Sequence, residues 1–185
     1  MTASGPRCER CFGTGPRCIC SKLTPIATRT RFVVLQHLLE AKKVSNTVRV
    51  AALCLCSLEL RTWGAPGVPP EHATADLDGE GVWLLDADGE PPPPLPATRV
   101  VLLDGSWSQV RRMAQRAPAL RGLRRVKLTV ERPQPSLRDA PAGGLSTLQA
   151  LAHAVALLEG ELAAAPVFAL HQLLVDRTLA ARGYV

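Results

Sequence analysis

Hydrophobic and polar positions along the chain follow two periods, one typical of strands and one typical of helices. Short apolar runs predict five strands, at 30–36, 58–63, 82–85, 100–103 and 123–130. Apolar residues spaced three and four apart predict four helices, at 46–57, 107–117, 147–160 and 166–182. This alternation predicts an α/β fold with a mostly parallel sheet and helices on both faces.

The strand at 100–103 is the most informative, because a tight turn and a helix start follow it directly. An Asp-Gly pair at 104–105 ends the apolar run, and Ser106 with Gln109 forms the S-x-x-Q pattern of a capping box. The helix is therefore expected to begin at Trp107. Open α/β sheets bind ligands just beyond the carboxyl ends of their strands, so this turn is a candidate ligand site.

A second turn of the same kind lies later in the chain. Gly143 and Gly144 precede Ser146 and Gln149, which form another S-x-x-Q pattern. Backbone N–H groups at such helix starts bind carboxylates and hydroxyls. Each turn alone is typical of an ordinary capped helix, and neither matches the G-x-G-x-x-G fingerprint or a P-loop. Together they predict a small-molecule cofactor site.

Four cysteines near the start of the chain have metal-ligand spacing, at Cys8, Cys11, Cys18 and Cys20. Four thiolates about 2.3 Å from one Zn²⁺ make a closed tetrahedral site, so the zinc would be structural. The segment 1–24 has few apolar residues, and metal binding would supply its folding free energy. Redox-active or incidental thiols are the alternative.

Charge and composition narrow the class of protein. The 185 residues carry a net charge of +6, and the range 111–138 holds nine Lys or Arg against one acid. This segregation is typical of nucleic-acid binding, although a solvated surface without a partner has the same composition. The sequence has no apolar stretch long enough to span a membrane and no secretory signal. We therefore expect a cytoplasmic protein with reduced cysteines.

Three histidines lie in or beside predicted elements. His37 follows the first strand, where it is either a ligand-facing group or the polar end of the strand. His153 lies off the apolar stripe of its helix, and His171 lies in the last helix. We interpret all three as structural, with satisfied hydrogen bonds for His171.

The motifs, in this order, resemble those of the DTW domain family. The resemblance spans residues 8 to 160 and rests on the cysteine spacing and four short motifs: His37-x2-Glu40, Asn46-Thr47-x-Arg49, Leu103-Asp104-Gly105-Ser106-Trp107-x-Gln109 and Leu145-Ser146-Thr147. This family comprises tRNA-uridine aminocarboxypropyltransferases. The chain departs from the family pattern at Ser106, where Thr is usual, and at Gln149, where Glu is common; 136–138 retains only part of the usual Tyr-Arg-x-Arg motif.

The resemblance implies a fold and a reaction. The fold would be SPOUT-like with a C-terminal trefoil knot, in a catalytic domain spanning 25–185 that binds S-adenosylmethionine. The reaction would transfer the 3-amino-3-carboxypropyl group to N3 of a tRNA uridine and release methylthioadenosine. The donor would contact the two capped turns, through Leu103, Gly105, Ser106, Trp107, Leu145, Ser146 and Thr147.

Further side chains are candidates for chemistry and RNA binding. Asp104 is either the general base for uridine N3 or an acceptor for N–H groups of its own turn. Trp107 either stacks on a base or packs under its helix. The candidate contacts to RNA phosphates are Lys42, Lys43, Arg49, Arg111, Arg112 and Arg138. Two of these, Arg49 and Arg138, are alternatively candidates for binding the carboxylate of S-adenosylmethionine.

Two other functions fit the same motifs. A SPOUT-type RNA methyltransferase would move the methyl group of the donor and release S-adenosylhomocysteine. A zinc-containing RNA-binding protein without catalysis would not bind S-adenosylmethionine at all. The identity of the small-molecule product and calorimetry with the donor separate the three possibilities.

Overall fold

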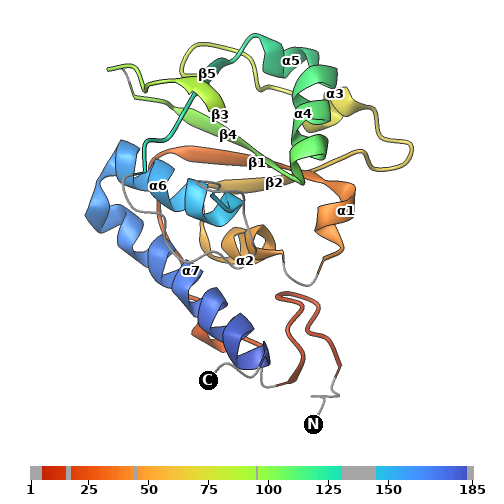
Figure 1. Cartoon of the computed structure of the whole chain (residues 1–185), viewed down its shortest axis with the longest axis vertical. Coiled ribbons are helices and arrows are strands. Elements are labelled where there is room, and N and C mark those ends of the chain that lie inside the picture. The colour runs from red at the N-terminus through yellow and green to blue at the C-terminus, as the bar shows by residue number, and fades with distance from the viewer. Residues whose placement is uncertain (1–5, 16–17, 44–45, 95, 131–144, 183–185) are drawn as a thin grey trace.

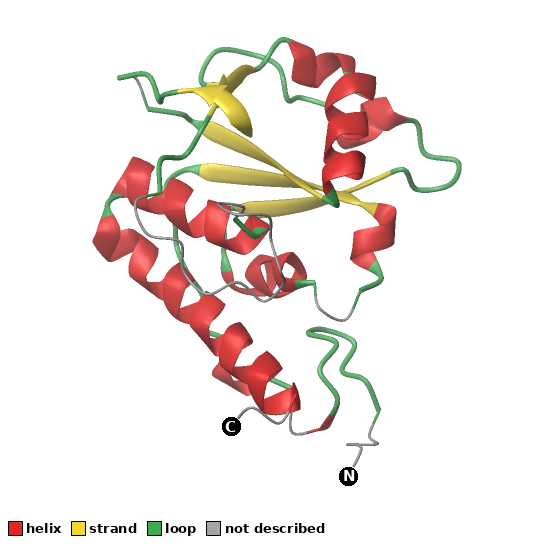
Figure 2. Cartoon of the chain, in the orientation of Figure 1, coloured by secondary structure: helices red, strands yellow, loops and turns green. Residues whose placement is uncertain are grey.

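A parallel sheet of five strands forms the centre of the computed structural model, which describes residues 6–15, 18–43, 46–94, 96–130 and 145–182. The strands are β1 (Arg31–His37), β2 (Leu58–Trp63), β3 (Val82–Glu90), β4 (Arg99–Asp104) and β5 (Arg124–Val126). Their order is β2-β1-β4-β3-β5, and all neighbours are parallel (Figure 1, Figure 2). The predicted parallel α/β sheet is confirmed.

Helices cover both faces of this sheet. They are α1 (Leu38–Ala41), α2 (Thr47–Cys54), α3 (Pro70–Ala73), α4 (Trp107–Arg116), α5 (Pro118–Arg121), α6 (Thr147–Glu159) and α7 (Glu161–Arg182). Helices α2, α6 and α7 pack on one face, and α3, α4 and α5 pack on the other (Figure 1). The sheet is therefore the middle layer of three.

Strand β1 shows why both faces are covered. Phe32 and Val34 pack in the core on the side of α2, α6 and α7, whereas Val33 and Leu35 pack on the side of α4 and α5. All four side chains are buried. Because successive side chains of a strand point to opposite faces, a continuous apolar run is stable only between two layers.

The connections that leave the neighbouring strands β1 and β4 run toward opposite edges of the sheet. From β1 it crosses through α1 and α2 to β2 on one side, and from β4 it crosses through α4 and α5 to reach β5 on the other side. The carboxyl ends of β1 and β4, which lead into α1 and α4 at one end of the molecule (Figure 1), flank a topological switch point. Ligands of open α/β sheets bind at such points.

Five predictions about the extent of elements are wrong. Helix α7 begins at Glu161 rather than at Pro166, which lies inside the helix; Gly160, with φ of +93°, lets the chain turn directly after α6. Strand β3 continues to Glu90, because it pairs with Val126 beyond an irregularity. The segment 64–81, which is predicted to be a loop, contains α3. Helix α2 ends at Cys54 rather than at 57. Strand β5 is only 3 residues long, shorter than the predicted strand at 123–130.

The SPOUT-like topology and the C-terminal trefoil knot stay predictions, since residues 131–144 lie outside the described part of the chain. Among the helices that the structure describes, none combines the length and apolar character needed to cross a membrane.

Candidate functional site

The carboxyl ends of β1 and β4 place two polar side chains next to each other. Gln36 and Asp104 are register partners in the parallel pair β1–β4, and Gln36 Nε2 donates to Asp104 Oδ2 at 2.8 Å. Gln36 is only 1 % exposed. Sequence reasoning missed Gln36; its one signal was a polar residue that ends an apolar strand directly before His37.

The second oxygen of the same carboxylate binds the other capped turn. Thr147 Oγ1, in the first turn of α6, donates to Asp104 Oδ1 at 2.7 Å. Asp104 therefore accepts hydrogen bonds from two uncharged side chains on two other elements. The predicted proximity of the two turns is confirmed by this contact, and Asp104 joins them rather than serving its own turn alone.

Both capped turns have the predicted geometry. In α4, Ser106 is the N-cap, and its backbone N–H donates to Gln109 Oε1 at 2.7 Å. In α6, the N–H of Ser146 donates to Gln149 Oε1 at 2.9 Å, and the N–H of Gln149 donates back to Ser146 Oγ at 3.2 Å. These reciprocal bonds satisfy N–H groups that a helix start otherwise leaves free.

Gly105 makes the first turn tight. A Cβ atom at this position would lie 3.0 Å from Gln109 Cβ and 3.6 Å from His37 Cβ. The turn after β4 therefore packs directly against the end of β1, and a side chain would displace Gln109 from its capping position. His37 itself caps α1, because its Nδ1 accepts from the N–H of Leu39 at 3.2 Å. Its interpretation as the polar end of a strand is confirmed.

Two large apolar side chains face solvent at this end of the sheet. Trp107 is 62 % exposed at the start of α4, and Leu39 is 57 % exposed in α1. The alternative in which Trp107 packs under its helix is therefore wrong. Leu103 and Leu145 are half-buried beside the same turns. An exposed aromatic ring next to a carboxylate suits the binding of a planar base.

The candidate basic residues lie in different surroundings. Arg111 and Arg112 are exposed on α4, where Arg112 Nε donates to the carbonyl of Ser108 at 3.2 Å. Lys42 is exposed, and Lys43 pairs with the buried Glu40.

Two basic candidates remain, Arg49 and Arg138. Arg49 is half-buried, with its Cζ 3.8 Å from the centre of the Phe12 ring, so it faces the cysteine segment. Arg138 lies outside the described residues, as do Gly143 and Gly144.

The four cysteines of the first segment come together. Their Sγ atoms all lie within 4.8 Å of one another, with Cys8 and Cys20 at 3.7 Å and Cys11 and Cys18 at 3.7 Å. Zn–S bonds of about 2.3 Å in a tetrahedron separate the sulfurs by about 3.8 Å. The donor set and its spacing therefore fit a zinc ion.

Electrostatics at the cysteine cluster favours a thiolate. Burial raises the pKa of Cys11, but hydrogen bonds from the N–H groups of Ile19 and Gly13 and from the thiols of Cys20 and Cys18 together outweigh burial and bring the pKa to about 6. The N–H of Gly13 lies 3.4 Å from Cys11 Sγ. Hydrogen bonds of this kind stabilise the anionic sulfur that metal binding requires.

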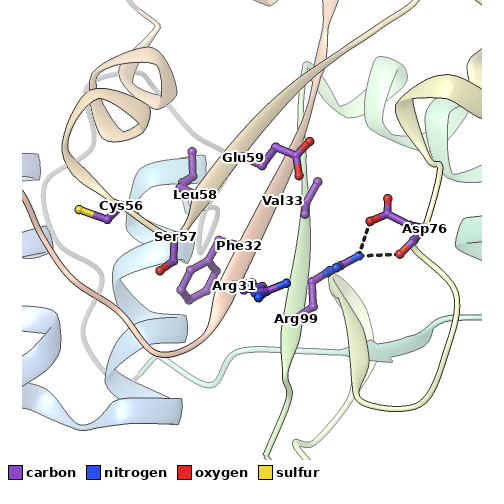
Figure 3. A pocket seen from close by; sticks show the side chains of 9 residues that line it. All are labelled: Arg31, Phe32, Val33, Cys56, Ser57, Leu58, Glu59, Asp76 and Arg99. Carbon is purple, nitrogen blue, oxygen red and sulfur yellow. Dashed lines mark hydrogen bonds and ion pairs between the residues drawn. The ribbon is translucent and has the colours of Figure 1, made fainter.

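A pocket of about 400 Å³ lies at the opposite edge of the sheet, at the amino ends of β1, β2 and β4 (Figure 3). Three of its charged side chains take part in ion pairs: Arg99 Nη1 lies 3.0 Å from Asp76 Oδ2, and the neighbouring Arg61 bridges Asp76 and Glu59. This pocket does not include any of the predicted site residues.

The fold and the site define a class of protein: a doubly wound α/β protein with a candidate ligand site at its switch point and a cluster of four cysteines that could hold a metal ion. The profile of the DTW domain matches residues 5–179, and the chain belongs to the DTW domain family.

Two curated relatives that match most of this chain have the same name. The chain is 29 % identical over 175 residues to tRNA-uridine aminocarboxypropyltransferase 2 of Macaca fascicularis, covering 83 % of this chain and 57 % of the relative. It is 33 % identical over 171 residues to the Drosophila melanogaster protein of the same name, covering 83 % of this chain and 66 % of the relative. The chain thus spans less than two thirds of the length of these relatives. No solved structure is significantly similar.

Proposed function

We propose that this protein transfers the 3-amino-3-carboxypropyl group of S-adenosylmethionine to N3 of a tRNA uridine and releases methylthioadenosine. Family membership and the names of its relatives support this reaction. The observation that carries the proposal is the contact of Asp104 with Gln36 and Thr147, because it joins two family motifs at the switch point of the sheet.

The proposal includes the fold and the organisation of the family. We assign residues 1–24 to the zinc-binding segment and 25–185 to a SPOUT-like catalytic domain with a C-terminal knot. The segment packs on this domain, since Cys11 and Ile19 belong to the core on the α2 side of the sheet. We expect the protein to act in the cytoplasm, where tRNA and the donor are available.

The donor is proposed to lie between the two capped turns. Its contacts would be the turn after β4 (Leu103, Gly105, Ser106 and Trp107) and the start of α6 (Leu145, Ser146 and Thr147). The hydroxyl of Thr147 is already bound to Asp104, so the backbone N–H groups of α6 are the groups offered to the donor's carboxylate. The positive end of the helix dipole favours an anion there.

Asp104 is proposed as the general base. A carboxylate offers about four lone-pair positions, and two of them accept from Gln36 and Thr147, so a further N–H can still bind. The proton of uridine N3 moves to Asp104, N3 forms a bond to the γ-carbon of the donor, and the C–S bond breaks. The electron pair of that bond stays on sulfur, which leaves as the neutral thioether, and Asp104 returns the proton to solvent.

The RNA is proposed to approach over α4 and α1. Arg111, Arg112 and Lys42 are exposed there and suit phosphate oxygens. Lys43 and Arg49 are retained as candidate contacts, although Lys43 pairs with Glu40 and Arg49 stacks on Phe12. Trp107 is exposed beside Asp104 and suits stacking on a base.

The four cysteines are proposed to hold a structural zinc ion. With four thiolates no coordination position remains open, so the metal supplies folding free energy and takes no part in the transfer. Native mass spectrometry tests this assignment. We expect one zinc ion per chain, and its loss in Cys11→Ser; an intact chain without zinc would contradict the assignment.

Incubation with tRNA and S-adenosylmethionine tests the reaction. Mass spectrometry should show aminocarboxypropyl-uridine in the RNA and methylthioadenosine in solution. S-adenosylhomocysteine with a methylated nucleoside would instead show methyl transfer. No binding of the donor in calorimetry, together with tight binding of tRNA, would show a non-catalytic RNA-binding protein.

A further inference from the structure

Phe12 is held within the metal-binding turn itself. It lies between Cys11 and Gly13, and its backbone N–H donates to the carbonyl of Cys8 at 2.9 Å. Its φ is +57°, a conformation that residues with a side chain rarely adopt. The backbone that presents two of the four thiolates therefore also fixes the direction of the Phe12 ring.

The Phe12 ring contacts the catalytic domain through Arg49. The guanidinium Cζ of Arg49 lies 3.8 Å from the ring centre, the distance of close stacking. Arg7 lies 5.7 Å from the same ring. Arg49 Nε is buried and, among the described residues, has no hydrogen-bond partner. The guanidinium is thus positioned by its stacking on Phe12 together with a hydrogen bond from Nη2.

Arg49 in turn holds the end of α1. Its Nη2 donates to the carbonyl of Ala41 at 3.1 Å. Asn46 supports the same connection, since its Nδ2 donates to the carbonyl of Glu40 at 2.9 Å and its Oδ1 accepts from the N–H of Arg49 at 3.0 Å. Together these bonds fix the last two carbonyls of α1, a helix too short to be stable by its own hydrogen bonds.

Helix α1 forms part of the rim of the candidate site. It begins directly after His37, which packs against Gly105, and it carries the exposed Leu39. A continuous series of contacts therefore runs from the cysteine turn through Phe12 and Arg49 to α1.

We propose that Phe12 and Arg49 are positioning residues that transmit zinc loading of the cysteine segment to α1 at the rim of the donor site. The inference deepens the proposed function, on which the identity of the donor rests. Loss of zinc releases the turn that orients Phe12, Arg49 loses its stacking partner, and α1 opens more often. The network of Asp104 stays intact, because neither Gln36 nor Thr147 depends on these contacts.

Hydrogen exchange of the α1 amides, measured without donor and without RNA, tests the coupling. In the wild type, removal of zinc by a chelator should speed exchange in α1 about fivefold, as expected for loss of a half-buried cation–π contact, and leave β4 unchanged. Zinc-loaded Phe12→Leu should already exchange at the fast rate and respond no further to zinc removal. Phe12→Tyr keeps the ring and should behave as the wild type.

Wild-type exchange in zinc-loaded Phe12→Leu would overturn the proposal, as would a wild type that ignores zinc removal. If Phe12→Leu fails to retain zinc, Arg49→Lys decides, because it leaves the cysteine turn untouched and keeps the charge while removing the stacking plane. Fast α1 exchange in zinc-loaded Arg49→Lys supports the proposal, and wild-type exchange overturns it.

A second measurement tests whether the opening of α1 affects binding of S-adenosylmethionine. Calorimetry with S-adenosylmethionine should show binding about fivefold weaker in zinc-loaded Phe12→Leu, if the energy of the lost contact is expressed at the rim. Unchanged affinity together with fast α1 exchange would overturn this connection. A wild type that binds no donor at all would overturn the proposed function instead, and the exchange data would still decide the coupling.

Discussion

The two edges of the sheet use carboxylates in opposite ways. At the amino edge, Asp76 lies between two arginines, with Arg61 Nη2 and Arg99 Nη1 each 3.0 Å from one of its oxygens. Figure 3 shows its pairing with Arg99. At the carboxyl edge, Asp104 is held by the uncharged donors Gln36 and Thr147. The first arrangement neutralises its carboxylate, whereas the second orients a carboxylate and leaves its charge available.

Under the proposed function, this difference separates the structural role of Asp76 from the chemical role of Asp104. Burial raises the pKa of Asp76, but its contacts with Arg61 and Arg99 outweigh burial and lower the pKa overall. A carboxylate bound in this way is a poor proton acceptor. Asp104, next to the exposed Trp107, is oriented without a counter-ion in the part of the chain that the structure describes. The proposed function therefore places proton transfer at the carboxyl edge, where the carboxylate has no arginine partner among the described residues.

The largest expected effect comes from removing the charge of the Asp104 carboxylate. Asp104→Asn keeps the shape and one acceptor oxygen, and the hydroxyl of Thr147 can rotate to accept from the new amide. If Asp104 is the base, turnover should fall about 100-fold or more, while binding of S-adenosylmethionine changes little. Single-turnover assays with tRNA and calorimetry with the donor provide the two measurements.

Asp76→Asn is the matched control for this test. The same change at the amino edge removes ion pairs from a largely exposed carboxylate, so it should cost less than about 1 kcal/mol of stability and leave turnover unchanged. Equal losses of turnover in Asp104→Asn and Asp76→Asn would contradict a specific role of Asp104 as the general base.

The next effect concerns RNA binding by the exposed arginines. The double variant Arg111→Ala with Arg112→Ala should weaken tRNA binding about tenfold and reduce the slope of log K against log salt by about 1.5, because two phosphate contacts are lost. Filter binding at several salt concentrations measures both quantities.

A second double variant sharpens that result. Arg29→Ala with Arg31→Ala removes the same charge from exposed positions at the amino edge. If the RNA lies only over α4 and α1, this variant should keep nearly the wild-type slope. Identical slopes in the two double variants would mean that net charge, rather than the face of α4, determines binding.

The uncharged donors should have a smaller effect than the carboxylate they hold. Gln36→Leu and Thr147→Val each remove one hydrogen bond to Asp104, and we expect turnover about tenfold lower in each, since a bond to a charged group contributes about 1.5–3 kcal/mol. Thr147→Ser keeps the hydroxyl and should stay near the wild type. Additive losses in the Gln36→Leu, Thr147→Val double variant would argue against a shared network; coupling between them is expected.

Local sequence was sufficient to predict the two capped turns, but not the residues that contact them from other elements. The capping boxes at Ser106 and Ser146 were predictable because each is formed by residues three apart in sequence. The hydrogen bond from Gln36 to Asp104 was not predictable, because it depends on which strands are neighbours in the sheet. The stacking of Phe12 on Arg49 was not predictable either, because it depends on how the cysteine segment packs on the rest of the chain. Periodicity indicates that a strand is buried, but not beside which strand.

Boundaries failed for a related reason. The start of α7 was placed too late, because proline is a strong local signal against a helix. Packing of Ala164 and Val167 in the core outweighs that preference and extends the helix back to Glu161. Likewise, β3 is extended by pairing with β5, a contact that no window of local sequence contains.

The smallest expected effect lies away from both edges, between α6 and α7, where polar groups lack partners. His171 is 1 % exposed, and its Nε2 has no hydrogen-bond partner among the described residues, which corrects the expectation of a satisfied histidine. His153 nearby has the same unpartnered Nε2 and packs edge-on against Phe168. Burial lowers the pKa of His171, and the charge of His153 lowers it further.

The sign of the pH dependence follows from this shift. Histidine in the unfolded chain has a pKa near 6.5 and binds a proton below that pH, whereas buried His171 binds a proton only at a lower pH. The native state should therefore keep its stability above pH 6.5 and lose it progressively as the pH falls below 6.5. Urea unfolding of His171→Phe should lie within about 1 kcal/mol of the wild type at pH 8 and fall less steeply toward acid pH. His72→Gln, at an exposed position, should retain the wild-type slope; the same slope in all three proteins would assign the acid sensitivity to other groups.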